Sequence, residues 1–132
     1  MSTQRRLQIG EVAEAVDLSI RTIRHYDELG VVVPSGRSSG GFRLYTEADV
    51  TRLLFVRKLK PLGFTLDEVQ ELITLRDGAL EGRLDDSGMT KLDAFASMAE
   101  ERCKGLRAQL KEAEIVATDL RTALGQVQGT VD

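Results

Sequence analysis

The chain has 132 residues, of which 42% are hydrophobic and 30% are charged, and its formal net charge is −3. That length supports one modest hydrophobic core but not two full domains, so we expect a single small globular unit with an appendage. The chain has a single cysteine, so we expect no intrachain disulfide. It has no apolar run typical of a secretory signal or a membrane span, so we expect a soluble cytoplasmic protein.

The first predicted elements are two short helices joined by a tight turn. In the helix from Ile9 to Val16, apolar residues recur at spacings of three and four. Ser19 is placed to cap a second helix, Ile20 to Leu29, by accepting a hydrogen bond from a backbone N–H. Gly30 ends that helix, because glycine tolerates a positive φ. This arrangement is typical of a helix-turn-helix.

The second helix separates an apolar face from a polar face. We expect Ile20, Ile23 and Leu29 to face the core. The residues predicted to contact DNA then lie mostly on the opposite side: Ser19, Arg21, Thr22, Arg24, His25 and Tyr26. Guanidinium groups can donate to guanine O6 and N7 or to phosphate, and hydroxyls can donate to phosphate. The same cluster could instead be a solvated polar face with Tyr26 half buried.

A β-hairpin, or wing, is predicted after the second helix. Residues 34–41 are rich in turn formers, and apolar and polar residues alternate over the next four positions. We expect Phe42 and Leu44 on one face, which leaves the other face and the turn with four predicted DNA contacts: Arg37, Ser38, Arg43 and Tyr45. Residues 19–60 contain eight basic and four acidic residues, a net charge of +4 against −7 for the rest. Such a local cationic region favours DNA binding in an acidic chain.

Two further helices follow the wing. Thr46 caps a helix predicted to run to Leu62, where Pro61 ends or kinks it. Thr65 caps the next helix with Glu68 as its capping-box partner, and this helix is expected to end near residues 77–78. The outer face of the third helix carries basic residues that could be either secondary DNA contacts or solvated surface: Arg52, Arg57, Lys58 and Lys60.

A long amphipathic helix is predicted at residues 89–128, after a Gly- and Asp-rich linker at 77–88 and before a tail at 129–132. Its apolar residues follow a heptad pattern: Leu92, Ala96, Ala99, Cys103, Leu106, Leu110, Ala113, Ala117, Leu120, Leu124 and Val127. The heptad pattern alone, from Leu92 to Val127, covers about 36 residues and roughly 54 Å of helix, too long to bury against the small head. We therefore predict that it pairs with a second copy, because folding back would require another long helix.

In this order, the elements resemble the MerR family of bacterial transcription regulators. The resemblance rests on "IGEVAEAVDLSIRTIRHYDELGVV" and "GGFRLYTEADVTRLLFVRKLKPLGFTLDEVQELI" and covers roughly Leu7 to Leu75. His25 departs from the aromatic residue usual in the family. The resemblance implies a mostly α fold, with a winged helix-turn-helix head at residues 1–76 that has a small β wing. A helical pair and a long, antiparallel coiled-coil dimerisation helix complete it.

The resemblance also implies a function. A homodimer would bind an inverted repeat in double-stranded promoter DNA and distort an overlong spacer, so that RNA polymerase holoenzyme can engage both promoter elements. One alternative is a DNA-architectural or recombination-accessory protein that uses the same head. Another is a coiled-coil interaction protein whose head no longer binds DNA. A small-molecule effector between the long helix and the partner's head is possible, and its identity stays open.

Metal and enzyme chemistry have little support in the sequence. Metal-sensing relatives use cysteines at the start of the long helix and beyond its end, and the corresponding stretches here contain no Cys or His. Cys103 lies on the heptad seam, where we expect it to pack as a small apolar residue. The only histidine, His25, lies on the expected DNA face, so no Ser-His-Asp arrangement is available. We expect no metal, no cofactor and no enzymatic activity.

Overall fold

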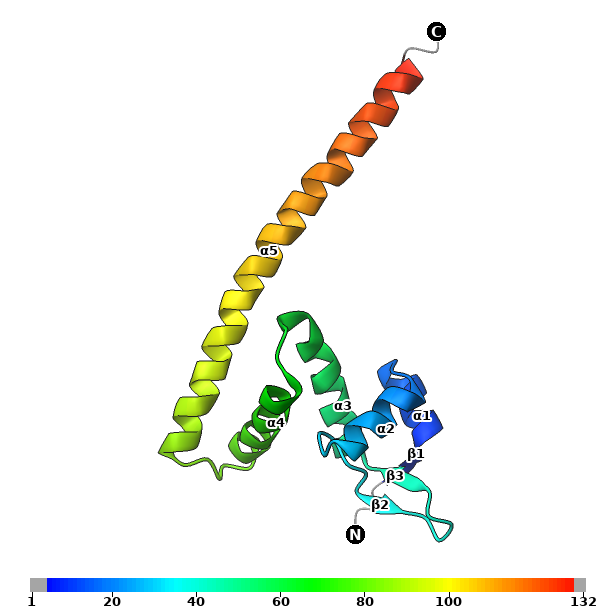
Figure 1. Cartoon of the computed structure of the whole chain (residues 1–132), viewed down its shortest axis with the longest axis vertical. Helices are drawn as coiled ribbons and strands as arrows, with labels where there is room; N and C mark the ends of the chain where they lie inside the picture. Colours follow the sequence, from blue (N-terminus) through cyan, green and yellow to red (C-terminus); the bar gives the residue numbers. More distant parts are fainter. Residues whose placement is uncertain (1–4, 130–132) are drawn as a thin grey trace. The chain divides into compact units, whose positions relative to one another are not determined.

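The computed structural model describes residues 5–129 of the chain. In chain order the elements are β1 (Leu7–Gln8), α1 (Ile9–Val16), α2 (Ile20–Glu28), β2 (Gly36–Arg37), β3 (Arg43–Tyr45), α3 (Glu47–Leu59), a 3-10 turn η1 (Lys60–Leu62), α4 (Leu66–Leu80) and α5 (Asp86–Gly129) (Figure 1). The chain divides into two compact units, and the boundary between them lies inside α5, between Leu92 and Asp93. The mostly α fold with a small sheet is therefore confirmed.

The helix-turn-helix is held by buried aliphatic side chains. Val12 and Val16 of α1 and Ile23 of α2 are fully buried, so the two helices share one core. Asp17, at φ 55°, ends α1 in the left-handed conformation. The prediction that α2 also turns Ile20 and Leu29 inward is wrong, because these side chains are 39% and 44% exposed. Ile20 is the first residue of α2 and Leu29 is its C-cap, so both lie at the ends of the helix, away from the buried Ile23.

The wing is part of a three-stranded antiparallel sheet with strand order β1-β3-β2. Gly36 pairs with Leu44 and Arg37 with Arg43, as expected for the predicted hairpin. The additional strand β1 places Leu7 opposite Tyr45. Its two residues are too few for a periodic pattern, so the sequence did not predict it.

Helices α3 and α4 begin at the predicted caps. The Thr46 side chain accepts from the backbone N–H of Asp49, and the Thr65 side chain accepts from that of Glu68. Helix α3 ends at Leu59 and not at residue 62, because the chain tightens into η1 at Pro61. The buried apolar residues that join this part of the head are Leu53, Val56, Leu59, Val69, Leu72, Ile73 and Leu75.

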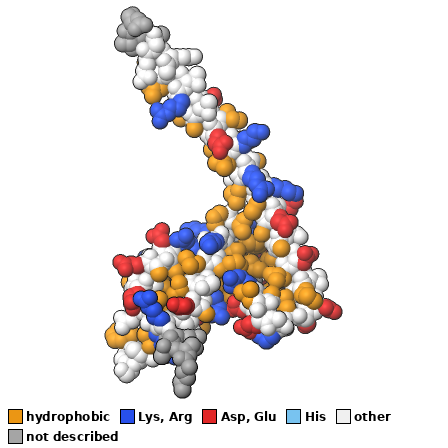
Figure 2. Space-filling model, turned by 180° about the vertical axis from the view of Figure 1, so that it is seen from behind, with side chains coloured by type: hydrophobic (Ala, Val, Ile, Leu, Met, Phe, Trp, Pro, Cys, Tyr) orange, Lys and Arg blue, Asp and Glu red, His pale blue; other side chains and the backbone are white. Residues whose placement is uncertain are grey.

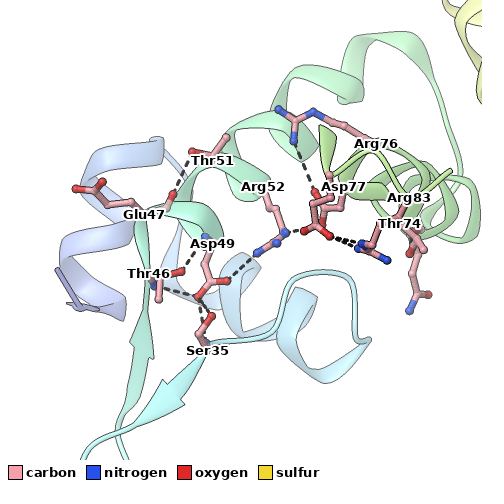
Figure 3. A network of polar contacts seen from close by, with 12 residues as sticks. Ser35, Thr46, Glu47, Asp49, Thr51, Arg52, Thr74, Arg76, Asp77 and Arg83 are labelled. Atoms are coloured by element: carbon pink, nitrogen blue, oxygen red, sulfur yellow. Dashed lines mark hydrogen bonds and ion pairs between the residues drawn. The ribbon is translucent and has the colours of Figure 1, made fainter. Parts of the chain in front are cut away.

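A polar network joins the loop after α2 to helices α3 and α4 (Figure 3). Asp49, 2% exposed, accepts from the backbone N–H and the hydroxyl of Ser35 at 3.1 and 2.6 Å and from the backbone N–H of Thr46 at 2.9 Å. Arg52 donates to Asp49 at 3.1 Å and to Asp77 at 2.8 Å. The hydrogen bond that Arg52 donates to Asp77 raises the pKa of Arg52 above its ordinary value. Arg52 thus has two carboxylate partners inside the head, and 31% of its side chain remains exposed.

The linker is shorter than predicted. Helix α4 continues through Gly78 to Leu80, and α5 begins at Asp86, so only residues 81–85 lie between them. Gly78 is buried within α4, where a Cβ would lie 3.0 Å from a Leu84 methyl carbon. The turn occurs at Gly82, which has φ +67°. Gly78 therefore allows close packing and does not end the helix.

Helix α5 has 44 residues and reaches Gly129; residues 130–132 of the predicted tail lie outside the described part of the chain. Its apolar side chains are exposed along the C-terminal half, including Leu110 at 58% and Leu120 at 67%. Within residues 5–129, no helix combines the length and the apolar character that a bilayer-spanning segment needs.

Candidate nucleic-acid interface

The outer face of α2 is the centre of the candidate site. The Ser19 side chain accepts from the backbone N–H of Thr22 at 3.0 Å and shares a 2.8 Å hydrogen bond with the Thr22 hydroxyl, which fixes the first turn. Arg21, Arg24 and His25 are exposed beyond this cap. The predicted polar face of α2 is therefore displayed to solvent.

An open hollow of about 460 Å³ lies along this face. It is lined by Arg21, Thr22, His25 and Tyr26 of α2 and by Leu66 of α4. Tyr26 is half buried, as the alternative of a solvated polar face predicts. The nearness of Leu66 to this face was not predicted, because it depends on how α4 packs and not on any local pattern.

Asp27 ties the wing to α2. Its carboxylate accepts from Arg43 Nε at 2.6 Å and lies 3.7 Å from Arg37 Nη2. The hydrogen bond that Arg43 donates to Asp27 raises the pKa of Arg43, so this guanidinium stays charged. Arg43 is 24% exposed and Arg37 52% exposed, so Arg37 presents more of its guanidinium to solvent. The sequence offers only a weak signal for this link, an acidic residue among the basic ones of the second helix.

The tip of the wing is closed by local hydrogen bonds. Ser38 N donates to the Phe42 carbonyl at 2.9 Å, and the Ser38 hydroxyl accepts from Phe42 N at 3.2 Å. Arg37 donates to the Gly41 carbonyl at 3.1 Å, and Gly41 has φ +82°. These contacts hold Arg37 and Ser38 at the tip of the hairpin.

Tyr45 is placed differently from the prediction. Its side chain is fully buried, and its hydroxyl has no hydrogen-bond partner among residues 5–129. Burial raises the pKa of Tyr45. The pairing of β3 with β1 turns this ring into the head, so the expected DNA contact by Tyr45 is not available in this structure.

The predicted dimerisation residues all lie on α5. Leu92, Ala99 and Cys103 are half buried, and Ala96 is exposed. The remaining seam positions are exposed: Leu106, Leu110, Ala113, Ala117, Leu120 and Leu124. Figure 2 shows hydrophobic side chains recurring along this helix among charged ones.

Comparison with known proteins identifies the family. The chain matches the family models "MerR HTH family regulatory protein" at residues 7–75 and "MerR, DNA binding" at residues 50–123. It is 36% identical over 128 residues to the mercuric resistance operon regulatory protein of Pseudomonas fluorescens, covering 95% of this chain and 81% of that protein. The chain belongs to the MerR family. It is a DNA-binding transcription regulator.

Solved structures agree with this assignment. The lead(II) complex of the regulator PbrR691 from Ralstonia metallidurans CH34 is similar at 35% identity and a TM-score of 0.56, covering 88% of this chain and 86% of that one. The regulator HiNmlR, a MerR-family protein lacking the sensor domain and bound to promoter DNA, shares the fold at a TM-score of 0.73 with 20% identity, covering 96% and 95%. Within residues 5–129 of this MerR-family regulator, no three His, Cys, Asp or Glu side chains group to hold a metal ion.

Proposed function

We propose that this MerR-family regulator acts as a homodimer on an inverted repeat within a promoter. Each head places α2 in a major groove, and the wing lies along the neighbouring phosphates. The dimer activates or represses by distorting the spacer between the promoter elements that RNA polymerase holoenzyme recognises. This places its action in the bacterial cytoplasm. The proposal assigns the protein no enzymatic role and requires no effector.

One observation carries this proposal: the exposed basic face of α2 lies beside a wing whose arginines are anchored to that same helix. Arg21 and Arg24 are three residues apart and therefore share one side of α2. Because Asp27 holds Arg43 at 2.6 Å, the wing and the helix keep a fixed relative position. A rigid pair of cationic elements can follow a groove and its flanking backbone together.

The charge distribution supports DNA as the partner of this face. Phosphate contacts supply most of the affinity of such interfaces, and the arginine side chains provide the sequence-reading contacts. Arg21, Arg24 and Arg37 supply cations in one region, while the first turn of α2 contains no acidic residue. The helix N-terminus thus also attracts phosphate.

The decisive experiment is selection of the operator from random duplexes, followed by affinity measurements on the selected sequence. We expect an inverted repeat, and we expect Arg24→Ala to weaken its binding by about 1–3 kcal/mol and to relax preference at one base pair. Lys111→Ala is the matched control, since it removes a cation from the exposed face of α5 and should leave base preference unchanged. Equal losses for both variants would contradict the proposed role of α2.

The architectural alternative makes a different prediction. Genomic mapping of binding sites would then find them at recombination arms or dispersed through coding sequence, and not between promoter elements. The interaction-protein alternative, in which the head no longer binds DNA, predicts that Arg24→Ala leaves the function of the protein intact.

A further inference from the structure

Helix α5 exposes an apolar stripe over its C-terminal half, and its residues specify what can cover it. Leu106, Leu110, Leu120, Leu124 and Val127 are 37%, 58%, 67%, 47% and 64% exposed. Leucines and valine at successive a and d positions form a seam for another helix. The distribution of large and small residues along this seam restricts how a second copy can pair with it.

Large and small seam residues alternate in blocks. Ala96, Ala99 and Cys103 are small, Leu106 and Leu110 are large, Ala113 and Ala117 are small, and Leu120, Leu124 and Val127 are large. An antiparallel pairing about a two-fold axis between Lys111 and Glu112 puts one small and one large residue in each of five layers. The layers join Ala96 to the partner's Val127, Ala99 to the partner's Leu124, Cys103 to the partner's Leu120, Leu106 to the partner's Ala117, and Leu110 to the partner's Ala113.

Uniform layers matter because two helices pack at nearly constant separation along a coiled coil. Moving the partner by one heptad shifts the axis to Ala108 or to Ile115. The first shift places Leu106 opposite the partner's Leu110, and the second places Leu110 opposite the partner's Leu120. Each shift also creates an Ala–Ala layer, so wide and narrow layers would alternate in one seam. Core packing therefore favours the axis between residues 111 and 112.

The charges beside the seam select the same register independently. The residue that directly follows each d position of a heptad occupies an e position. In an antiparallel pair, residues at the e positions of the two helices face each other. With the axis between residues 111 and 112, Glu100 faces the partner's Arg121, and Arg107 faces the partner's Glu114. By symmetry each attractive pair occurs twice. Lys104 pairs with Glu101 inside the helix at 3.0 Å, whereas these four side chains make no ion pair within the described residues.

The competing arrangements place like charges together. The shift toward Ala108 brings Arg107 against the partner's Arg107, and the shift toward Ile115 brings Glu114 against the partner's Glu114. A parallel, in-register pair would bring Arg107 beside the partner's Arg102 and would stack alanine on alanine and leucine on leucine. Like charges at such positions are destabilising.

We propose that α5 pairs with the α5 of a second copy in an antiparallel register whose two-fold axis lies between Lys111 and Glu112. The inference rests on the proposed homodimer and adds the register of its paired α5 helices and the interchain ion pairs. This register brings Cys103 level with the partner's Leu120. The two Cys103 residues are then separated by about 25 Å along the helix axes, because the levels of residues 103 and 120 are seventeen positions apart and each position adds about 1.5 Å.

Cysteine cross-linking of the full chain tests the register. Under mild oxidation we expect the unmodified chain to form no covalent dimer, since the two Cys103 thiols are far apart. Leu120→Cys adds a thiol in the layer of Cys103, and a disulfide needs Cα atoms within about 7 Å. We therefore expect a covalent dimer whose linked peptides contain positions 103 and 120. The matched variant Ala113→Cys places its thiol about 10 Å from that layer and should not link to Cys103.

Other outcomes overturn the proposal. A Cys103–Cys103 link in the unmodified chain would show a parallel pair, and a link from position 113 to Cys103 would show the shifted register. Sedimentation of the uncross-linked chain distinguishes a failure of the proposed homodimer from a failure of the proposed register. A monomer would contradict the proposed homodimer itself, whereas a dimer without the 103–120 link would contradict only the register.

A charge exchange gives a second test. Glu114→Arg places two arginines together at both symmetric pairs, and we expect the dimer dissociation constant to rise roughly tenfold at low salt. Adding Arg107→Glu to the same chain should restore most of the affinity. Glu112→Arg makes the same charge change at an outward position and serves as the control. Equal effects of Glu114→Arg and Glu112→Arg, or no rescue by the second substitution, would refute the assigned ion pairs.

Discussion

Removing the carboxylate of Asp49 should disconnect the loop after α2, which contains Ser35, from helices α3 and α4. The side chain of Asp49 is 3% exposed and serves four donors: two from Ser35, the backbone N–H of Thr46, and Arg52. Asp49→Ala leaves the Thr46 N–H buried without an acceptor, since Thr46 is 7% exposed. Ser35 is exposed, so its donors regain water.

The expected loss in the free energy of unfolding follows from the donors that Asp49 serves. An unsatisfied buried donor costs about 1–3 kcal/mol. Breaking one side of a buried ion pair costs about 3–5 kcal/mol, and here the cost is reduced because Arg52 keeps Asp77 at 2.8 Å. We expect Asp49→Ala to lower the free energy of unfolding by about 3 kcal/mol. Asp49→Asn keeps an acceptor oxygen and should lose less.

Urea unfolding followed by circular dichroism measures this loss, with all variants at equal chain concentration because a dimer gains stability with concentration. Glu47→Ala is the control, since Glu47 is an exposed acidic residue in the same first turn of α3 and should contribute about 0.3–1 kcal/mol. If Asp49→Ala costs no more than Glu47→Ala, the network does not hold the head together as described.

Three further changes test separate features. Tyr45→Phe removes a buried hydroxyl without a hydrogen-bond partner among the described residues, so stability in thermal melts should be unchanged or rise by up to about 1 kcal/mol, and DNA affinity by fluorescence anisotropy should not change. Thr65→Ala removes the cap of α4 and should cost about 1 kcal/mol in urea unfolding. Gly105→Ala adds a Cβ with no neighbour within 4 Å and should stabilise α5 by up to about 1 kcal/mol. Gly88→Ala places its Cβ 2.8 Å from Leu84 Cγ and should lose that gain. Equal melting temperatures for the two alanine variants would contradict this packing.

Local signals in the sequence predicted much of the head. The bounds of α1, the caps at Ser19, Thr46 and Thr65, and the turn at Gly30 with φ +74° depend on residues within one helical turn, and the structure confirms them. The exposure of Arg21, Arg24 and His25 followed from the same periodicity, whereas the exposure of Ile20 and Leu29 did not.

The errors arise where distant segments meet. Tyr45 is buried because β1 pairs with β3 across 38 positions of sequence, from Leu7 to Tyr45. The link between Asp27 and Arg43 is likewise non-local, across 16 positions, and so is the contact of Asp49 with Ser35, across 14 positions. Helix α4 passes its expected end because Gly78 packs against Leu84, a contact that a glycine-rich stretch does not reveal.

The central claim is that two copies present paired α2 helices to one DNA site. Hydroxyl-radical footprinting on the selected operator, combined with the measured mass of the complex, tests it most directly. We expect two protected patches related by the two-fold axis of the inverted repeat, with two chains in each complex. A single protected patch occupied by one chain at saturation would contradict the account.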